Sequence, residues 1–193
     1  MRAARQWGKT IVLLLAFLPL LLSAQRKEGR LLVDSLLGVL PGLKDDTMKV
    51  RVLNTLSRNY YEIDLEEAMK RGKQAVALAE KLGYKNGEGK GDNILGGICY
   101  IKGDYPEAMK NNMAALKLFE QTGNKDGVAG CYLTIGNAYA NQDNYPEAFK
   151  NYFAALKIFE ETKNHEGLEG CLENLGAIYQ SINEIQENLI YNL

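Results

Sequence analysis

The segment YPEAMKNNMAALKLFEQT (105–122) recurs forty residues later as YPEAFKNYFAALKIFEET (145–162). Aligned without gaps, the blocks 85–124 and 125–164 agree at 17 of 40 positions. Chance would give roughly two or three, since a common residue makes up about 5–9% of a typical chain. A third copy begins at His165, and a weaker copy precedes the first of the two blocks. Self-similarity at a fixed period of this size is typical of repeat proteins.

Each unit is predicted to fold as two helices. In the segment 145–162, apolar residues recur at i, i+4, i+7, i+8 and i+11, which is one helical face; they are Ala148, Tyr152, Ala155, Leu156 and Phe159. No alternating apolar pattern of useful length predicts a strand. Small residues are expected where two helices touch, namely at Ala108, Ala115, Ala148 and Ala155.

Caps and breaks mark the ends of these helices. Three residues are predicted to be N-caps, and each has a glutamate three residues later as a capping-box partner: Asp64 with Glu67, Asp104 with Glu107, and Asn144 with Glu147. The helix breaks recur at Gly103-Asp104, Gly123-Asn124 and Lys163-Asn164.

These residues resemble the tetratricopeptide repeat. That family's helix–turn–helix unit of about 34 residues has Leu-Gly, Tyr, Ala, an aromatic and Ala at set spacings, and the third unit matches with Ile135-Gly136, Tyr139, Ala148, Tyr152 and Ala155. The resemblance implies an all-α fold, a right-handed α-solenoid of helical hairpins with a 40-residue period. The departures are Cys99 in place of the Tyr, Asn112 in place of the aromatic, and a first unit without the Leu-Gly pair.

Stacked hairpins curve and leave a concave face, which the resemblance implies is lined by the first helix of each unit and holds a protein or peptide. By analogy with the family's groove positions, the candidate partner-binding residues are Lys90, Asn93, Tyr100, Leu133, Asn137, Asn141, Glu173 and Gln180. The cation of the family's carboxylate clamp would fall on Asn93, Leu133 or Glu173. None of these is basic, so we expect no clamp for a terminal carboxylate.

The first 24 residues are predicted to be a signal peptide. Arg2, Arg5 and Lys9 precede a run of 12 apolar residues, 11–22, and Ser23-Ala24 supply small residues before Gln25; this is the order of a secretory signal. A membrane span needs about 20 apolar residues, so an uncleaved anchor is the less favoured alternative. We expect secretion across the inner membrane into the periplasm, with no stable membrane span after cleavage.

The remaining chain divides into an N-terminal part, 25–44, and the repeat domain, 45–193. Residues 31–37 are predicted to form a short capping helix followed by a linker, and the units span about 45–84, 85–124, 125–164 and 165–193, the last incomplete. A leader, a short helix and 40-residue repeats resemble the extracytoplasmic sensor regions of bacterial membrane histidine kinases and related regulators.

Composition removes most catalytic and binding chemistries. The chain has 23 Lys+Arg against 24 Asp+Glu, one His and three Cys. A net charge of -1 argues against nucleic acid as a partner, and the single imidazole argues against a metal site. His165 is expected to be exposed, and Cys99, Cys131 and Cys171 are expected to be small buried apolar residues without a disulfide. We therefore predict no catalytic residue and no cofactor.

The last unit has room for a second helix only from about Glu184 to Leu193. Its apolar residues Leu189, Ile190 and Leu193 would then form an exposed patch. Two explanations are left open: a shortened relative of a longer sensor, or self-association through the incomplete C-terminal repeat.

The sequence thus predicts an exported, non-enzymatic scaffold that mediates protein–protein interaction or sensing. The alternative is a truncated sensor region of a two-component histidine kinase or a transcriptional regulator. An enzyme is a third, weaker alternative, because no nucleophile–base pair is found.

Overall fold

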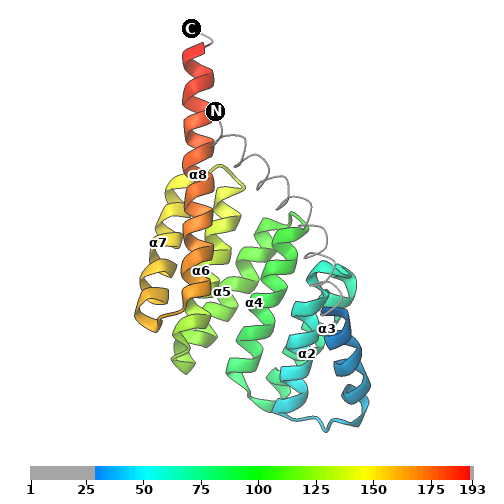
Figure 1. The fold of residues 1–193 in the computed structure, drawn as a ribbon. Coiled ribbons are helices and arrows are strands. Elements are labelled where there is room, and N and C mark those ends of the chain that lie inside the picture. Colours follow the sequence, from blue (N-terminus) through cyan, green and yellow to red (C-terminus); the bar gives the residue numbers. More distant parts are fainter. Residues whose placement is uncertain (1–28, 192–193) are drawn as a thin grey trace, which may run out of the picture.

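The computed structural model describes the backbone of residues 29–191 and the side chains as far as Glu184. Within 29–191 the regular structure is entirely helical (Figure 1). Residues 29–39 form the first helix and so contain the predicted helix 31–37. The elements that follow are η1 (Leu40–Gly42), α2 (Thr47–Asn59), η2 (Tyr60–Glu62), α3 (Leu65–Leu82), α4 (Lys85–Ile101), α5 (Tyr105–Thr122), α6 (Lys125–Ala140), α7 (Tyr145–Thr162) and α8 (His165–Tyr191). The predicted signal peptide, 1–24, lies outside the described residues.

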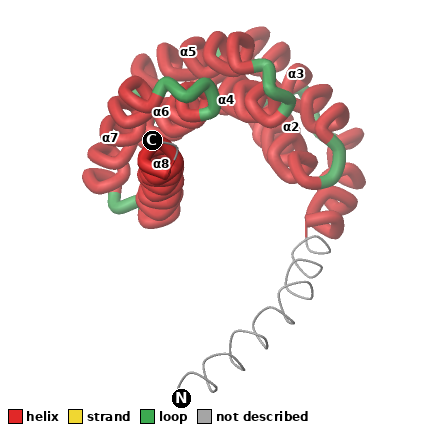
Figure 2. The backbone as a smooth tube through the Cα atoms, turned by 90° about the horizontal axis from the view of Figure 1, so that it is seen from above, coloured by secondary structure: helices red, strands yellow, loops and turns green. Residues whose placement is uncertain are grey.

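The helices repeat every forty residues, as predicted. The second helices α3, α5 and α7 begin at positions 65, 105 and 145, and the first helices α4, α6 and α8 begin at 85, 125 and 165. Seen from above in Figure 2, α2, α4, α6 and α8 line the inner side of an arc, and α3, α5 and α7 form its outer side. The predicted α-solenoid of hairpins is confirmed.

The turns between hairpins end α3, α5 and α7 in the same way. Gly83, Gly123 and Lys163 adopt the left-handed conformation with φ of 64°, 67° and 58°. This conformation lets the N–H groups beyond the helix reach the carbonyls of its last turn. Glycine adopts it without a Cβ clash, whereas Lys163 does so at some cost. The predicted breaks at 123–124 and 163–164 are therefore confirmed.

At two of the three predicted N-caps, the side chain forms the capping hydrogen bond. Asp64 Oδ1 accepts the N–H groups of Glu66 and Glu67 at 2.9 and 3.1 Å, and Asp104 Oδ1 accepts that of Glu107 at 3.2 Å. Asn144 is the N-cap residue of α7, as predicted, but its side chain makes no capping hydrogen bond. Its backbone closes the turn instead, with its N–H donating to the Tyr139 carbonyl at 3.0 Å.

The predicted capping boxes were also wrong. A capping-box glutamate accepts the N–H of the N-cap residue, but at Asp64, Asp104 and Asn144 that N–H already donates to a carbonyl of the preceding helix or turn, 2.8–3.0 Å away. The glutamates pair instead with the lysine three residues further on, at 2.6, 3.0 and 3.3 Å; the pairs are Glu67–Lys70, Glu107–Lys110 and Glu147–Lys150.

The helices of a hairpin approach closely because small residues lie at their contacts. The four predicted alanines, at positions 108, 115, 148 and 155, are fully buried. A glycine on the first helix also faces a larger side chain on the second. A Cβ on Gly136 would lie 2.7 Å from Cε1 of Tyr152, and a Cβ on Gly96 would overlap the amide of Asn112. These glycines are required by the close approach.

The first hairpin makes the same contact, but here the glycine is on the second helix and the larger residue is on the first. Here the glycine, Gly72, lies on the second helix α3, and Ser57 on α2 faces it, with its Oγ 3.0 Å from where a Cβ on Gly72 would be. Ser57 Oγ donates to the Ala68 carbonyl at 2.7 Å. Leu56-Ser57 therefore takes the place of the Leu-Gly pair that this unit lacks.

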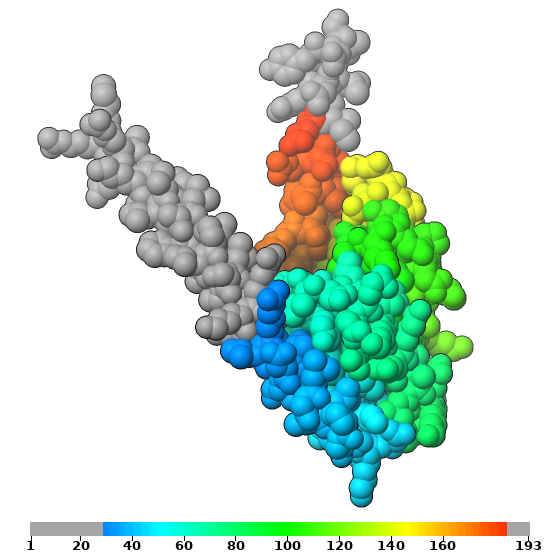
Figure 3. Space-filling view, turned by 90° about the vertical axis from the view of Figure 1, so that its right-hand side faces the viewer, coloured from blue at the N-terminus to red at the C-terminus, as the bar shows by residue number. Residues whose placement is uncertain are grey.

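The prediction of a second helix from Glu184 was wrong, because α8 continues as one helix from His165 to Tyr191. In units two and three, a left-handed residue, Gly103 or Asp143, follows the first helix, and a proline lies in the first turn of the second helix. Unit four has Asn183-Glu184-Ile185-Gln186 at these positions, without a proline to stop the helix. Figure 1 shows the C-terminal half of α8 rising beyond α7, and in Figure 3 the described side chains of α8 also stand above those of α7. The side chains of Leu189, Ile190 and Leu193 lie outside the described residues.

A carboxyl group, that of Asp92, is buried on α4. Asp92 is 9% exposed and forms no hydrogen bond or ion pair with any other described residue. Burial, followed by the charges of Glu88 and Glu80, raises the pKa of Asp92 to about 7 from its ordinary value of 3.8. At neutral pH the protein therefore holds a partly ionised carboxylate in a position that favours its neutral form.

We predict that Gly136→Ala lowers the free energy of unfolding by about 1–3 kcal/mol relative to Gly176→Ala. Both substitutions gain the same helix propensity, but a Cβ at 136 meets the Tyr152 ring whereas a Cβ at 176 meets no atom within 4 Å. Urea unfolding followed by circular dichroism measures the difference. Equal stability of the two variants would show that the crossing tolerates a methyl group.

We predict that Asp92→Asn stabilises the protein at pH 8, by at most roughly 4 kcal/mol given the size of the pKa shift. Because the folded-state pKa is raised, ionisation costs stability fully above about 7, and this cost disappears as the pH falls to the unfolded value near 3.8. The gain from Asp92→Asn should therefore shrink between pH 8 and pH 4. A gain that does not change with pH would contradict this, and chemical denaturation at each pH measures it.

Candidate functional site

The predicted groove residues lie on the inner helices, and seven of the eight line two hollows. The first, called the charged hollow here, has a volume of about 760 Å³ and contains Lys90, Asn93, Leu133 and Glu173. The second, called the amide hollow, has a volume of about 320 Å³ and contains Tyr100, Asn137 and Asn141. Gln180 lines neither hollow, and its Nε2 donates to Glu184 Oε1 at 3.1 Å on its own helix.

The crossing residues of the hairpins hold two groove asparagines in place. Asn93 Nδ2 donates to Oδ1 of the fully buried Asn112 at 2.8 Å, and Asn112 Nδ2 in turn donates to the Ala108 carbonyl at 2.8 Å. One unit later, the Tyr152 hydroxyl donates to Asn137 Oδ1 at 2.7 Å. The residue that sets the distance between the two helices thus also orients an amide on the inner face.

The amide hollow is held by hydrogen bonds between successive units. Asn141 Nδ2 donates to the Tyr100 hydroxyl at 2.6 Å and to the Asn137 carbonyl at 3.0 Å. Tyr100 belongs to α4, whereas Asn137 and Asn141 lie at the end of α6, so these bonds join the second and third units. Asn174 and Ser181 of α8 add further polar groups to the lining. Asp143, whose Oδ1 accepts from the Tyr145 hydroxyl at 3.1 Å, also lines the hollow, which therefore offers amide and hydroxyl groups together with one carboxylate.

The charged hollow carries cations and carboxylates on different helices. Its cations are Arg58 of α2 and Lys90 of α4. Its carboxylates are Asp126 of α6 and Glu166, Glu169 and Glu173 of α8. Asp126 is already engaged, since its Oδ1 accepts from Thr162 Oγ1 at 2.7 Å and from Asn164 Nδ2 at 3.3 Å.

Sequence reasoning missed Arg58, Glu166 and Glu169 as groove residues. Leu56-Ser57 precedes Leu95-Gly96 by 39 residues, one fewer than the repeat period. When the groove positions of the later units are moved back by forty residues each, they therefore miss Arg58 by one position. Once this shift is counted, Arg58 corresponds to Asn137. A search for any small residue after Leu, rather than for Gly alone, would have found it.

The three cysteines and the single histidine lie as the sequence predicts. Cys99, Cys131 and Cys171 are free and buried, as predicted, and burial raises the pKa of Cys131 to about 12 and that of Cys171 to about 11. These thiols are therefore protonated and shielded. His165 is exposed, as predicted.

Neither a metal site nor a membrane span is found in the described part of the chain. No group of three or more His, Cys, Asp or Glu residues there is placed to hold a metal ion. None of the helices described combines the length and the apolarity needed to cross a membrane.

Residues 128–162 match the protein family described as Tetratricopeptide repeat. The solved structure of a Rap protein complexed with Competence and Sporulation Factor is similar, with a TM-score of 0.75 and 20% identity over 88% of this chain and 48% of that one. The apo form of RapI has a TM-score of 0.65 and 21% identity over 80% of this chain and 57% of that one. This chain thus spans about half the length of both.

A Podosopora anserina protein with nearly identical TPR-like repeats, named after kinesin light chain, has a TM-score of 0.58 and 18% identity over 86% of this chain and 82% of that one. None of the curated proteins matches the sequence. At these identities the solved structures establish the fold alone. The chain is a helical-repeat solenoid whose third unit matches the tetratricopeptide repeat family, and the relation to histidine kinase sensor regions stays a prediction.

We predict that Tyr152→Phe lowers the free energy of unfolding by about 0.5–1.5 kcal/mol, because it removes the hydrogen bond to Asn137. Tyr132→Phe is the matched control, since the Tyr132 hydroxyl bonds to none of the described residues; it should change stability by less than about 0.5 kcal/mol. Denaturant unfolding of both variants measures the effect. Equal losses in both would mean that the bond to Asn137 contributes nothing.

Proposed function

We propose that the inner face of the solenoid binds an extended segment of another protein, and that the chain is a non-enzymatic interaction scaffold or sensor. The observation that carries this proposal is the set of oriented amides in the two hollows. Asn93, Asn137 and Asn141 are each held by a hydrogen bond to another side chain of the solenoid, at 2.8, 2.7 and 2.6 Å.

An extended peptide presents N–H and C=O groups that have no partners within the peptide itself. With these bonds made, Asn93 and Asn141 keep an amide oxygen that can accept and Asn137 keeps an NH2 group that can donate. Together they suit such a backbone regardless of its side chains. Holding the amides in place beforehand reduces the entropy lost on binding. The Rap protein with the similar fold was solved in complex with Competence and Sporulation Factor, which supports a protein or peptide as the partner here.

Export and sensing belong to the same proposal. The order of residues 1–24, cations first, then an apolar run, then small residues, supports secretion into the periplasm. A sensor region of a histidine kinase or a transcriptional regulator is the form of this function that the repeat pattern and the leader suggest together.

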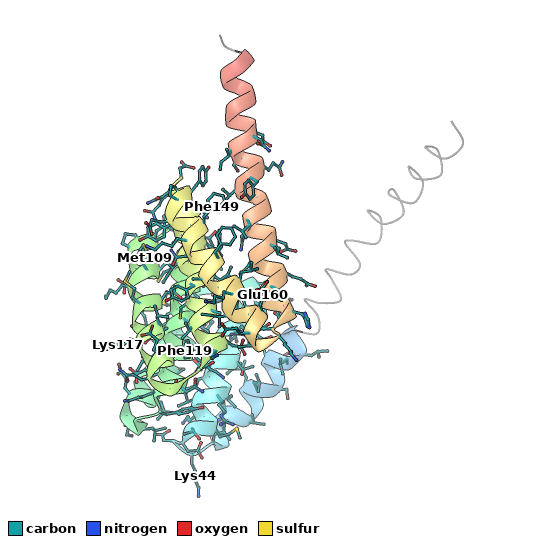
Figure 4. The ribbon with its side chains drawn as sticks, turned by 90° about the vertical axis from the view of Figure 1, so that its left-hand side faces the viewer. Lys44, Met109, Lys117, Phe119, Phe149 and Glu160 are labelled. Carbon is teal, nitrogen blue, oxygen red and sulfur yellow. The ribbon has the colours of Figure 1, made fainter. Side chains whose placement is uncertain are left out.

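Self-association through the C-terminal end of the solenoid is also proposed. Leu172 and Tyr179 of α8 are 58% and 56% exposed, and Gly176 between them meets no atom within 4 Å. The equivalent Gly136 is covered by Tyr152 of α7. The ring of Phe149, labelled in Figure 4, lies 5.3 Å from that of Tyr179 and extends this apolar surface onto α7.

The test is selection of binding peptides from a displayed random library, followed by titration of the selected peptides. We expect the double variant Asn137→Ala/Asn141→Ala to weaken their binding at least about tenfold, since it removes two oriented amides. Lys117→Ala on the outer face of α5, labelled in Figure 4, is the control and should bind normally. Selected peptides that bind both variants equally would place the binding surface elsewhere.

A further inference from the structure

We propose that the charged hollow has a polarity that selects its partner, an extended peptide with cationic side chains at one end and acidic side chains at the other. The cationic end lies against α8 and the acidic end against α2 and α4. This inference rests on the proposed function, because it names the class of peptide that the inner face receives.

The opposite charges line one hollow but come from opposite arms of the arc. Arg58 and Lys90 belong to α2 and α4, whereas Glu166, Glu169 and Glu173 belong to α8. In Figure 2, α2 and α8 lie on opposite arms of the arc, with its open side between them. The volume of about 760 Å³ is within the range of about 300–1,000 Å³ that is common for ligand cavities.

None of these five charges is neutralised within the described part of the chain. The ion pairs found there lie elsewhere, many of them on single outer helices. On α3, α5 and α7, a glutamate pairs with the lysine three residues later. The sequence of α8, His165–Tyr191, contains neither Lys nor Arg, so its glutamates cannot be paired in this way.

The α8 glutamates share one helical face. Positions 166, 169 and 173 follow i, i+3 and i+7, which places the three carboxylates in a row along the helix. A row of like charges in a concave wall concentrates the field and attracts ions of opposite sign. A run of lysine or arginine side chains matches this row.

Between the two charged walls the hollow carries one carboxylate, Asp126 of α6, which already accepts hydrogen bonds from Thr162 and Asn164. Asn93 of α4, with its amide held by Asn112, and Leu133 of α6 are uncharged lining residues. Gly130 on α6 has no side chain there, and a Cβ at this position would meet only Asn93 Oδ1, at 3.9 Å. This part of the wall accepts a peptide backbone closely, so the two charged ends decide which peptide fits and in which orientation.

The test uses two labelled peptides of identical composition with blocked termini. One carries its lysines in one half and its glutamates in the other, and the second alternates them. By fluorescence anisotropy at low ionic strength, we expect the first to bind at least about tenfold more tightly, with the advantage falling at high salt. Equal affinities, or no binding of either peptide, would overturn the proposed polarity.

Charge reversals then locate the two ends. Glu169→Lys/Glu173→Lys and Arg58→Glu/Lys90→Glu should each weaken binding of the segregated peptide at least about fivefold, and the four substitutions together should restore it, because the peptide binds in the opposite orientation. Glu120→Lys/Glu160→Lys, at exposed positions of α5 and α7, is the control and should change little. Failure of the fourfold variant to restore binding would contradict the proposal.

The outcomes separate this inference from the proposed function. If Asn137→Ala/Asn141→Ala weakens binding of the selected peptides but no charge reversal changes their affinity, the proposed polarity is wrong and the proposed groove stands. If neither set of substitutions changes the affinity of the selected peptides, both the proposed function and the proposed polarity are wrong.

Discussion

The fold depends on one close contact, the crossing of the two helices in each hairpin. At this point Gly96 and Gly136 lie against Asn112 and Tyr152, and any larger residue on the first helix would push the pair apart. The same contact also reaches the inner face, because Asn112 and Tyr152 bond to Asn93 and Asn137. Packing inside the hairpin and the arrangement of polar groups in the groove are therefore consequences of the same residues.

The two ends of the array show what this contact requires. In the first hairpin the glycine has moved to α3, as Gly72, and Ser57 of α2 fills the space. In the fourth unit Gly176 remains, but α8 continues straight past the point where a second helix would turn back. Each repeat of a solenoid is stabilised by its neighbours, so Leu172 and Tyr179, whose counterparts in earlier units are better covered, are left exposed.

The inner and outer faces of the arc carry their charges differently. Outer helices pair glutamate and lysine along a single helix, an arrangement that contributes little to stability because solvent screens it. On the inner face, cations and carboxylates lie on separate helices and have no such local partners. Because of this separation, one side of the concave surface is cationic and the other is acidic. The neutral amides add hydrogen-bonding groups for a peptide backbone of any sequence.

The helical repeat, its forty-residue period, the buried alanines and the helix breaks at 123–124 and 163–164 could be predicted from the sequence, because these depend on contacts within one unit or between units that follow each other. The sequence also placed seven of the eight groove candidates in hollows. The three-dimensional packing was needed to show that the Asn144 side chain makes no capping bond, that α8 continues to Tyr191, that Ser57 substitutes for a glycine, and that Arg58 shares a hollow with Glu166 and Glu169. The physical reason is that a hollow is formed by helices far apart in the chain, and its members depend on how the whole stack curves.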